Sequence, residues 1–452
     1  MKNIDHIINS LETQRILVIG LAETGLSYAN YFASRKTPLI FSDDKECPKK
    51  LKQIKNLYPD ANYYLAGNIC QEDYTLILVS PGISPSNKII RNAVKQGIPI
   101  LTDLDIFCAY NNSKKIIVTG TNGKTTVTTL INKVLIASGA NSIMGGNVFP
   151  PILDLVNVEA DVFVIEASSF QLYYSNNMHA DISVILNITE DHLDWHSSIE
   201  QYQKAKLKLS YCSDNMVINS DDNNINISNH NSSKVLRYGI EDQEKTDFTF
   251  DKTKELSTIN YKKEEYLTIN NPYLDFYHNK SNLLAITAIC HLFCVKRTIL
   301  KMEFEKFKGL PHRMQTVPTN DAIQWINDSK STNSSSLYAS IKSFKRNIIL
   351  IMGGDDKGSG FDQLVSNLEK SSVTNIILIG KSKQKFLSFL ENKISCEIAD
   401  DLKSAVYIAK DLAEENEVVL FSPGCSSKDM FSDYIDRGNT FIQSVNDCTS
   451  NI

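Results

Sequence analysis

Residues 120–126 have the sequence Gly-Thr-Asn-Gly-Lys-Thr-Thr, a combination suited to holding phosphate groups. The glycines let backbone N–H groups turn toward an anion, and Lys124 adds a positive charge beside them. Thr125 and Thr126 offer hydroxyl groups to a magnesium ion carried on the phosphates. The sequence therefore predicts a nucleotide-phosphate site in this loop. The other residues of the predicted site are Gly120, Thr121, Asn122 and Gly123.

The segments on either side of this loop have the patterns of a strand and a helix. Residues 116–118 are short and apolar, as in a buried strand. After the loop, apolar residues recur at intervals of three and four, which is typical of one face of a helix: Val127, Leu130, Ile131, Val134 and Leu135. The general P-loop places four residues between its glycines, whereas two separate Gly120 from Gly123 here. The alternative is a polar turn that contains Gly-Lys by chance.

Two later segments also have the pattern of strands that end in polar residues. Residues 162–166 end in Glu166, and residues 182–187 lead into Thr-Glu-Asp-His at 189–192. In a nucleotide-binding fold such positions face the phosphates, so Glu166 could hold magnesium directly or through water. The alternative is that Glu166 is a surface carboxylate.

The chain before the phosphate loop contains another pattern of strand, helix and strand. Residues 16–20 and 39–44 have the composition of buried strands, and a helix is expected between them. A Rossmann-like unit of this kind binds its ligand where the strands end. Ala22 stands where the second glycine of the dinucleotide fingerprint would allow a pyrophosphate to approach closely. The alternative is a packed βαβ unit without a ligand.

The last third of the chain alternates in the same way. Residues 348–352, 376–379 and 418–421 are strand-like, and each segment precedes a helical stretch. Loops at 353–358 and 422–427 follow two of these strands, at the edge where an open α/β sheet binds its ligand.

We therefore expect an α/β protein of three domains, for which 452 residues are sufficient at about 150 residues each. The predicted N-terminal Rossmann-like domain covers residues 1–106, the central P-loop ATPase domain 107–309 and the C-terminal Rossmann-like domain 310–452. Residues 220–277 are rich in Asn, Asp, Lys and Ser, with short strand-like pieces such as residues 235–238, and we expect them to form a variable part at the surface of the central domain.

The composition is that of an ordinary globular protein, with 42% hydrophobic and 22% charged residues. A net charge of −5 argues against a nucleic-acid binder that relies on a broad basic surface. Nine cysteines without a C-x-x-C pair suit a reducing compartment, and Cys290 and Cys294 are expected to share a buried helical face. Neither a signal peptide nor a membrane-length apolar run is visible, so we expect a cytoplasmic monomer without a membrane partner.

Eight short motifs resemble those of the Mur ligases of peptidoglycan synthesis and occur in the family's order. They lie at residues 119–126, 145–147, 166–171, 187–192, 310–313, 326–333, 353–358 and 422–427. The resemblance extends from the first strand to the C-terminal helix and is strongest for the branch of the family that adds D-glutamate.

The resemblance implies three domains with successive roles: a UDP-sugar site, an ATPase and an amino-acid site. The implied reaction joins D-glutamate to the carboxylate of UDP-N-acetylmuramoyl-L-alanine, with ATP cleaved to ADP and phosphate. A carboxylate resists attack by an amine because its oxygen is a poor leaving group, and phosphorylation overcomes this by forming an acyl phosphate. The protein then mainly positions the reactants and neutralises charge around the transferring phosphoryl group.

The same resemblance assigns roles around ATP and, it implies, two magnesium ions. Lys124 would hold the β- and γ-phosphates, Thr125 and Glu166 the first ion, and His192 and a carbamylated Lys206 the second. For His192 the alternatives are a zinc site shared with His196 or a capping role beside Asp194. For Lys206 the alternative, from the residues alone, is a solvated helix-face lysine like Lys204 or Lys208.

The remaining assignments implied by the resemblance fall into four groups. Catalytic roles go to Lys124, His192, Lys206, Asp328 and Lys330. The ATP contacts beyond the loop are Asn282, Arg313 and Asp328. The D-glutamate contacts are Lys330, Thr332, Lys357, Ser427 and Tyr434, with tyrosine at 434 where the family has phenylalanine. The UDP-substrate contacts are Thr24, Asp43, Lys45, Ser80, Asn147 and His192, and Ala22 and Asp44 depart from the usual pattern nearby.

The nearest alternatives are a Mur ligase that adds another amino acid and a folylpolyglutamate synthetase. The Asp-Asn-Pro-Arg string typical of the diaminopimelate-adding enzyme does not occur in the sequence. The folate enzyme lacks a Rossmann-like domain before its phosphate loop. A further alternative is a regulator that binds ATP and a UDP-sugar without joining anything. Such a regulator would not need His192, Lys206, Asp328 and Lys330 together.

Overall fold

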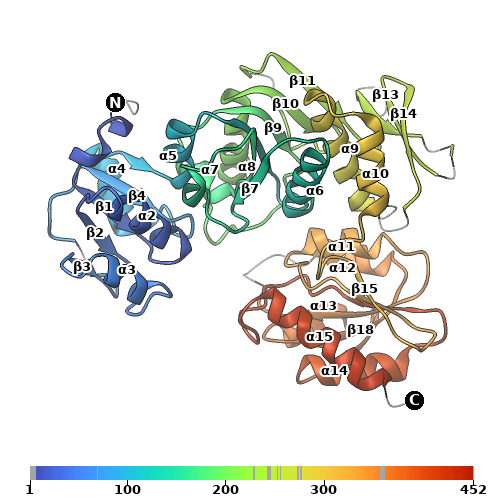
Figure 1. Cartoon of the computed structure of the whole chain (residues 1–452). Helices are drawn as coiled ribbons and strands as arrows, with labels where there is room; N and C mark the ends of the chain where they lie inside the picture. Colours follow the sequence, from blue (N-terminus) through green and yellow to red (C-terminus); the bar gives the residue numbers. More distant parts are fainter. Residues whose placement is uncertain are drawn as a thin grey trace. The chain divides into compact units, whose positions relative to one another are not determined.

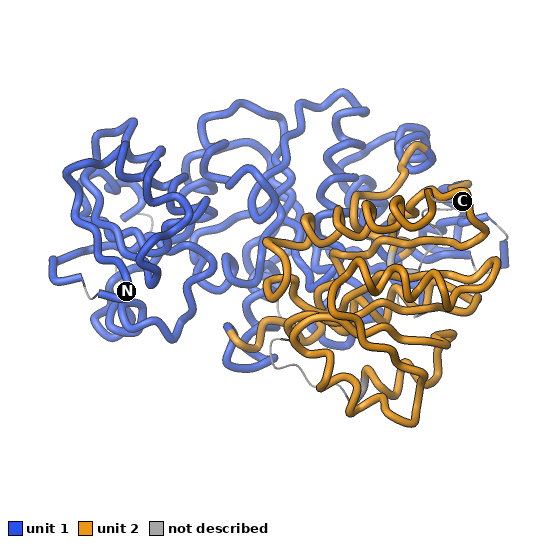
Figure 2. Tube along the Cα trace, turned by 90° about the horizontal axis from the view of Figure 1, so that it is seen from below, with its two compact units in different colours: residues 1–188, 195–269, 281–305 blue, residues 189–194, 270–280, 306–452 orange. Residues whose placement is uncertain are grey.

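The computed structural model describes residues 7–68, 70–227, 230–241, 246–251, 253–254, 256–271, 274, 277–356 and 362–450. The chain forms two compact units, drawn in blue and orange in Figure 2. The first unit comprises Met1–Ile188, Trp195–Ile269 and Ser281–Glu305, and the second comprises Thr189–Asp194, Asn270–Lys280 and Lys306–Ile452. In the described part of the chain, the first unit holds two sheets and the second holds one.

The first sheet is a parallel sheet of five strands in the order β3-β2-β1-β4-β5 (Figure 1). Its strands are β1 (Ile16–Ile19), β2 (Leu39–Ser42), β3 (Tyr63–Tyr64), β4 (Leu76–Val79) and β5 (Ile100–Leu101). Its helices are α2 (Glu23–Ala33), α3 (Leu51–Leu57), α4 (Lys88–Gln96) and α5 (Asp103–Tyr110). Every residue of β1 and β4 is buried, which explains their uninterrupted apolar sequences.

The strand order of the first sheet reverses between β1 and β4, and the loops after these two strands meet there. Ser80, directly after β4, donates from Oγ to the carbonyl oxygen of Gly20 at 2.7 Å. Gly20 has φ +91°, and a Cβ atom built on it would lie 2.7 Å from the Cβ of Ser80. The close approach of the loops after β1 and β4 therefore requires glycine at position 20.

The second sheet has nine strands in the order β14-β13-β12-β11-β10-β9-β6-β8-β7. The strands are β6 (Lys114–Thr119), β7 (Ser142–Gly146), β8 (Val162–Glu166), β9 (Ala180–Ile185), β10 (Ser213–Asn219), β11 (Lys234–Tyr238), β12 (Phe248–Phe250), β13 (Ser257–Tyr261) and β14 (Glu264–Ile269). All neighbours pair in parallel except β12 with β13 and β13 with β14. The strands predicted before and after the phosphate loop are confirmed.

The helices of this part are α6 (Lys124–Ala137), α7 (Ser169–Tyr174), α8 (Ile199–Leu207), α9 (Tyr277–Leu292) and α10 (Arg297–Lys306). Short 3₁₀ helices occur at Leu11–Thr13, Ile152–Leu155 and Lys208–Tyr211. The apolar face predicted for the helix after the phosphate loop is buried in α6, so that prediction is confirmed.

The expectation of a surface-lying part at residues 220–277 is wrong for its described strands. These strands, β11 to β14, extend the central sheet, and Tyr238, Phe248 and Ile259 are fully buried in it. The polar residues that dominate this segment separate short strands, which individually give a weak apolar signal.

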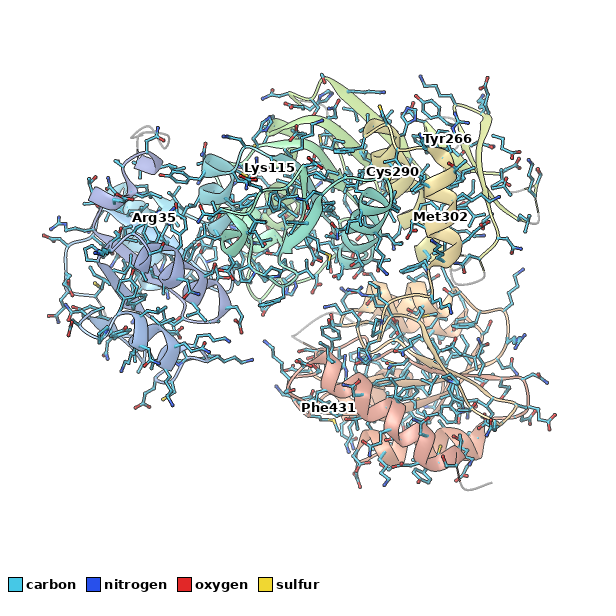
Figure 3. The ribbon with its side chains drawn as sticks, viewed as in Figure 1. Arg35, Lys115, Tyr266, Cys290, Met302 and Phe431 are labelled. Atoms are coloured by element: carbon cyan, nitrogen blue, oxygen red, sulfur yellow. The ribbon has the colours of Figure 1, made fainter. Side chains whose placement is uncertain are left out.

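Lys115 and Cys290, both labelled in Figure 3, are buried residues of the first unit. Lys115, near the start of β6, donates from Nζ to the carbonyl oxygens of Asn111 at 2.6 Å and Ser113 at 2.9 Å.

Cys290 is buried in α9, as predicted, but Cys294 is exposed beyond the end of that helix, so the two do not share a buried face. The structure pairs none of the nine cysteines. In the described chain, no helix is long and apolar enough to cross a membrane.

The third sheet, in the second unit, has six strands in the order β15-β16-β20-β17-β18-β19 (Figure 1). The strands are β15 (Gln315–Val317), β16 (Gln324–Asn327), β17 (Ile348–Gly353), β18 (Val373–Ile379), β19 (Ser395–Ile398) and β20 (Val418–Phe421). The helices are α11 (Ser334–Ile341), α12 (Asp362–Glu369), α13 (Lys383–Leu390), α14 (Leu402–Leu412) and α15 (Tyr434–Thr449). Strand β15 pairs antiparallel at one edge, and the other pairs are parallel.

The three strands predicted in this sheet are confirmed, and the sheet has a hydrophobic core on each face. Residues from α11, α12 and α13 contribute to one core, and residues from α14 and α15 contribute to the other. The α/β fold class is confirmed. The domain boundaries expected at 106/107 and 309/310 stay a prediction.

Buried carboxylates join the first two sheets within the first unit. Thr102 and Asp105 form a capping box at the start of α5, and Asp105 also accepts from the backbone N–H of Asn176 at 2.8 Å. Gln171 on α7 donates from Nε2 to Asp103 Oδ1 at 3.2 Å. Burial raises the pKa of Asp103 to about 6 from the ordinary 3.8.

This raised pKa predicts a pH dependence of stability. The folded protein holds the Asp103 proton more tightly than the unfolded chain does. The contribution of this group to the free energy of unfolding is therefore full below about pH 4 and is lost as the pH rises to about 6. Above that pH, burying the ionised carboxylate costs about 3 kcal/mol. Asp103→Asn should therefore flatten the dependence of the urea midpoint on pH between 4 and 6. The exposed Asp60→Asn is the matched control and should keep the wild-type curve. A variant at Asp103 that follows the wild-type curve would contradict this account.

Candidate active site

The predicted phosphate loop connects β6 to α6, with Gly123 as the residue before the helix. Gly123 has φ +84°, a left-handed conformation that side chains other than glycine rarely adopt. A Cβ atom built on it would lie 2.5 Å from Oδ1 of Asn282. The structure thus brings Asn282, predicted as an ATP contact, against the predicted phosphate loop.

Asn187 holds this loop in shape. Its backbone oxygen accepts from the N–H of Thr121 at 2.8 Å, and its Oδ1 accepts from the N–H of Asn122 at 2.8 Å. Its Nδ2 donates to the carbonyl oxygen of Asn122 at 3.1 Å. Asn187 closely follows β9, which pairs with β6, so two neighbouring strands position the two partners. The predicted site residues did not include Asn187, although its place beyond a strand end was a usable signal.

Two lysine side chains reach the backbone at the start of the loop. Lys124 donates from Nζ to the carbonyl oxygens of Gly120 at 2.8 Å and Thr121 at 2.9 Å. Lys206 on α8 also donates from Nζ to Gly120 at 2.8 Å, and it is 1% exposed. The hydroxyl of Tyr202 lies 2.8 Å from Thr121 Oγ1, and its ring lies 4.6 Å from the Lys206 ammonium. Both lysines are therefore near the position expected for a phosphate.

The exposure of the three lysines around α8 differs. Lys206 is buried, Lys204 is exposed, and Lys208 is half-buried with its ammonium donating to Ser175. Lys206 is therefore not a solvated lysine on the helix face, whereas Lys204 is.

Glu166 ends β8 and is 2% exposed. Its Oε1 accepts from Nδ2 of Asn147 at 2.7 Å, and its backbone oxygen accepts from the N–H of Asn147 at 2.8 Å. Oε2 is buried and has no hydrogen-bond partner among the described residues. An unpaired buried carboxylate oxygen is costly, and a cation ligand is a chemical role that would satisfy it. A surface carboxylate at position 166 is excluded.

The rest of the loop's predicted ligands lie in the first turn of α6. Thr125 is half-buried and Thr126 is buried. Among the described residues, no group of three or more His, Cys, Asp or Glu side chains gathers to hold a metal ion. Magnesium, unlike zinc, is commonly bound by one or two protein oxygens together with substrate phosphates and water.

His192 belongs to the second unit, whereas Lys124, Glu166 and Lys206 belong to the first. Its φ is +57°, and its Nε2 lies 3.6 Å from Oδ2 of Asp191. Asn333 donates from Nδ2 to the same carboxylate oxygen at 3.0 Å. Its proposed zinc partner, His196, is fully buried in the first unit among aromatic rings and lies 3.0 Å from Ser169 Oγ. His196 therefore has a packing role.

The candidates for uridine diphosphate surround the loops of the first sheet. Asp43 accepts from the N–H of Leu21 at 2.7 Å and from the N–H of Lys45 at 2.8 Å, so its carboxylate fixes two turns. Thr24 lies in the first turn of α2. A pocket of about 320 Å³ lies next to these positions, and neither they nor Ser80 line it. Its lining residues are Ser42, Asp44, Gly67, Asn68, Ser86, Asn87, Lys88, Ile89 and Arg91.

Asp328 follows β16 in the second unit and is buried. It accepts from Ser340 Oγ at 2.6 Å, from Ser422 Oγ at 3.0 Å and from the N–H of Met314 at 3.2 Å. Burial raises the pKa of Asp328 to about 6, and these hydrogen bonds together with the charge of Arg313 oppose the rise. Asp328 is thus a carboxylate held by several donors at the edge of the third sheet.

The predicted amino-acid contacts gather beside Asp328. The Lys330 ammonium lies 3.9 Å from the centre of the Tyr434 ring, a cation–π contact. Thr332 is half-buried in the same loop, and Ser427 is buried in the loop after β20. The carbonyl oxygen of Ser427 accepts from the N–H of Phe431, labelled in Figure 3, at 2.9 Å. Lys357 lies outside the described residues.

Profiles of Mur ligase domains match three successive parts of the chain. They are the MurD-like N-terminal domain at residues 14–102, the middle domain at 118–290 and the glutamate ligase domain at 312–425. A UDP-N-acetylmuramoylalanine--D-glutamate ligase of Buchnera aphidicola subsp. Schizaphis graminum is 36% identical over 436 residues, which cover 95% of this chain and 97% of that protein. The chain belongs to the Mur ligase family.

This Mur ligase is also similar to relatives from other bacteria. A protein of the same name from Shewanella oneidensis is 34% identical over 442 residues, covering 95% of this chain and 97% of that protein. One from Methylobacillus flagellatus is 30% identical over 443 residues, covering 97% and 98%. The Mur ligase is therefore an enzyme of the ligase class.

Solved structures confirm the Mur ligase fold. The UDP-N-acetylmuramate-alanine ligase of Thermotoga maritima has a TM-score of 0.61 at 17% identity, covering 96% of this chain and 100% of that chain. The MurF ligase of the same organism, solved with ADP, has a TM-score of 0.62 at 13% identity, covering 91% and 95%.

The conformation of Gly123 yields a prediction with a matched control. Gly139 also has a positive φ, +93°, but a Cβ atom built on it would meet nothing within 4 Å. Both Gly123→Ala and Gly139→Ala should lose about 1–2 kcal/mol of stability from backbone strain, measured by urea unfolding. Gly123→Ala should in addition lose affinity for ADP in calorimetric titration, because the new methyl group displaces Asn282. Equal ADP affinity in the two variants would contradict the predicted contact between Asn282 and the nucleotide.

Proposed function

We propose that this Mur ligase joins D-glutamate to UDP-N-acetylmuramoyl-L-alanine and cleaves ATP to ADP and phosphate. The observation that carries the proposal is the near-full-length likeness to ligases whose names contain this pair of substrates, with 36% identity over 95% of the chain. The loop between β6 and α6 supports it, because Lys124, Gly123 and Asn282 meet there in an arrangement suited to a nucleotide phosphate.

The reaction has two steps. A carboxylate oxygen of the UDP-substrate attacks the γ-phosphorus of ATP, the bond to the bridging oxygen breaks, and ADP leaves behind an acyl phosphate. The amine of D-glutamate then attacks the acyl carbon, phosphate departs with one of the original carboxylate oxygens, and the amine nitrogen loses a proton. Both steps concentrate negative charge, so orientation and nearby positive groups account for most of the catalysis.

In this proposal Lys124 holds the β- and γ-phosphates, and the loop of residues 120–126 surrounds them. Asn282 and Arg313 contact the rest of ATP, together with Asp328. Loop rigidity supports these roles, because Asn187 fixes the two residues between the glycines.

Magnesium, when bound, neutralises charge between the phosphoryl oxygens. Thr125 and Glu166 fit the first ion, because Oε2 of Glu166 is buried without a partner among the described residues. Asn147 fixes the other carboxylate oxygen, so Oε2 is the one left to face an ion. His192 and a carbamylated Lys206 are the proposed ligands of a second ion.

D-Glutamate brings two carboxylates, which basic and hydroxyl groups can recognise. Lys330, Thr332, Lys357, Ser427 and Tyr434 form its proposed site. The contact between the Lys330 ammonium and the Tyr434 ring supports it, because the ring holds the cation without consuming its charge. Phenylalanine would offer the same face, so the tyrosine at 434 preserves this function.

The UDP part of the substrate is proposed to meet Thr24, Asp43, Lys45 and Ser80, with Asn147 and His192 at its muramoyl-alanine end. The meeting of the loops after β1 and β4 supports this placement, because open α/β sheets bind ligands at such a reversal.

Phosphate release tests the proposed function directly. With ATP, magnesium and UDP-N-acetylmuramoyl-L-alanine, we expect release on addition of D-glutamate and little on addition of L-alanine, L-lysine or diaminopimelate. If one of those amino acids gives comparable phosphate release, the proposal that D-glutamate is the substrate is contradicted. Nucleotide binding without release in any mixture would instead favour a regulator that binds both ligands and joins nothing.

Carbamylation of Lys206 makes a separate prediction. Lys206→Ala should lose most activity, and added acetate should partly restore it, because a small carboxylate can supply the missing anionic oxygen in the cavity that the substitution leaves. Phosphate release measured against acetate concentration tests this.

Two lysine variants serve as controls for this rescue. Lys204→Ala, two residues earlier in α8 and exposed, should keep near-normal activity. Lys124→Ala should be inactive and indifferent to acetate, because its missing group is a cation. A folded, inactive Lys206→Ala protein that responds to no short acid would reject the carbamate and leave Lys206 with the loop-holding role seen in its bond to Gly120.

A further inference from the structure

Arg437 is a buried arginine in the first turn of α15 and is 1% exposed. Among the described residues, no carboxylate forms an ion pair with it, and its hydrogen bonds go to one hydroxyl and two carbonyl oxygens. Burial lowers the pKa of its guanidinium to about 10, so it remains charged at neutral pH. Burying a charge in this way is costly and calls for a compensating function.

The guanidinium group joins two loops at the edge of the third sheet. Its Nη2 donates to the carbonyl oxygen of Ser329 at 2.7 Å, and its Nε donates to Ser329 Oγ at 3.1 Å. Its Nη1 donates to the carbonyl oxygen of Cys425 at 3.0 Å. Ser329 precedes Lys330 in the loop after β16, and Cys425 lies two residues before Ser427 in the loop after β20.

A third loop packs on the same group. A Cβ atom built on Gly354, at the start of the loop after β17, would lie 3.5 Å from Arg437 Nη1. Asp355 and Ser426 then exchange two backbone hydrogen bonds, of 3.1 and 2.9 Å, which tie this loop to the loop after β20.

A hydrogen-bond chain also connects Arg437 to the backbone of Tyr434, the residue whose ring contacts Lys330. Ser329 accepts from Arg437 Nε at its Oγ, and the same hydroxyl donates to the carbonyl oxygen of Tyr434 at 2.8 Å. The Lys330 ammonium lies over the Tyr434 ring. A displacement of the guanidinium therefore reaches both partners of the cation–π contact.

We propose that Arg437 is the positioning residue of the amino-acid site, because its planar guanidinium fixes the loops that carry Lys330, Thr332 and Ser427. The proposal rests on the proposed function, which assigns the amino-acid substrate to these loops. Its donors diverge in one plane toward two different backbones, a geometry that the point charge of lysine cannot reproduce. Arg437 touches no reacting atom in this scheme and acts through the loops.

The test compares Michaelis constants for the two co-substrates. Arg437→Lys and Arg437→Met should each raise the KM for D-glutamate about tenfold or more, while the KM for ATP stays within about twofold. The lysine variant keeps the charge, so a near-normal KM for D-glutamate in that variant would contradict the claim that the planar guanidinium is needed to fix the loops. An equal rise for ATP in both variants would overturn the positioning role and indicate general loss of structure.

Ser329→Ala keeps the test decisive if the arginine variants fail to fold. It removes one hydroxyl that accepts from Arg437 and donates to Tyr434, and it should raise the KM for D-glutamate severalfold with ATP unaffected. Ser444→Ala is the matched control. Ser444 is also a buried serine, but it lies in α15, the helix of Arg437, and donates to the carbonyl oxygen of Thr440 within that helix. An unchanged KM for D-glutamate in Ser329→Ala would contradict the proposal.

The outcome is separable from that of the proposed function. If wild-type enzyme responds to a different amino acid, the proposed substrate is wrong, and the same variants are then compared with that amino acid. If wild-type enzyme uses D-glutamate and the variants do not change its KM, the proposed function holds and the positioning role of Arg437 is wrong.

Discussion

The hydrogen bonds between Asn187 and the phosphate loop are the interaction on which the proposed nucleotide site depends. A loop whose amides are to face an anion cannot also fold back on itself, so its remaining polar groups need partners outside the loop. Asn187 supplies three such bonds from the neighbouring strand, and Gly123 supplies a backbone conformation that lets α6 begin at once. The parallel pairing of β6 with β9 sets the distance between these two segments, which ties the geometry of the loop to the register of the sheet.

Each unit accommodates buried charge at the edge of a sheet. In the first unit, Lys206 donates to a backbone carbonyl and Glu166 shares one oxygen with Asn147. In the second, Asp328 accepts from hydroxyl groups and Arg437 donates to carbonyl groups. In each case, uncharged hydrogen-bonding groups help to hold the charged side chain in place.

Much of this arrangement could be predicted from the sequence, because its signals are local. The apolar run before Gly120 predicts β6, and the helical spacing of apolar residues after the loop predicts α6. Glu166 lies at the end of β8, a strand that the sequence also predicts. Residues 235–238 are strand-like in the sequence, but the place of β11 to β14 within the central sheet was not predicted, because polar residues dominate their segment. Partners distant in sequence carry no local signal: nothing near position 437 indicates that its side chain reaches residues 329 and 425. The exposure that separates Lys206 from Lys204 likewise depends on packing, which spacing alone does not determine.

The position of Arg437 in the chain also bears on how the enzyme is made. Ribosomes deliver a protein from its amino end, and upstream domains generally fold first. The strands around the phosphate loop, and Asn282 after them, are complete about 150 residues before α15, so they can form while the rest of the chain is still being synthesised. The loops after β16, β17 and β20 emerge before the guanidinium that ties them together. During translation, the phosphate loop can therefore form before the proposed amino-acid site acquires its final shape, and α15 is the element that completes that site.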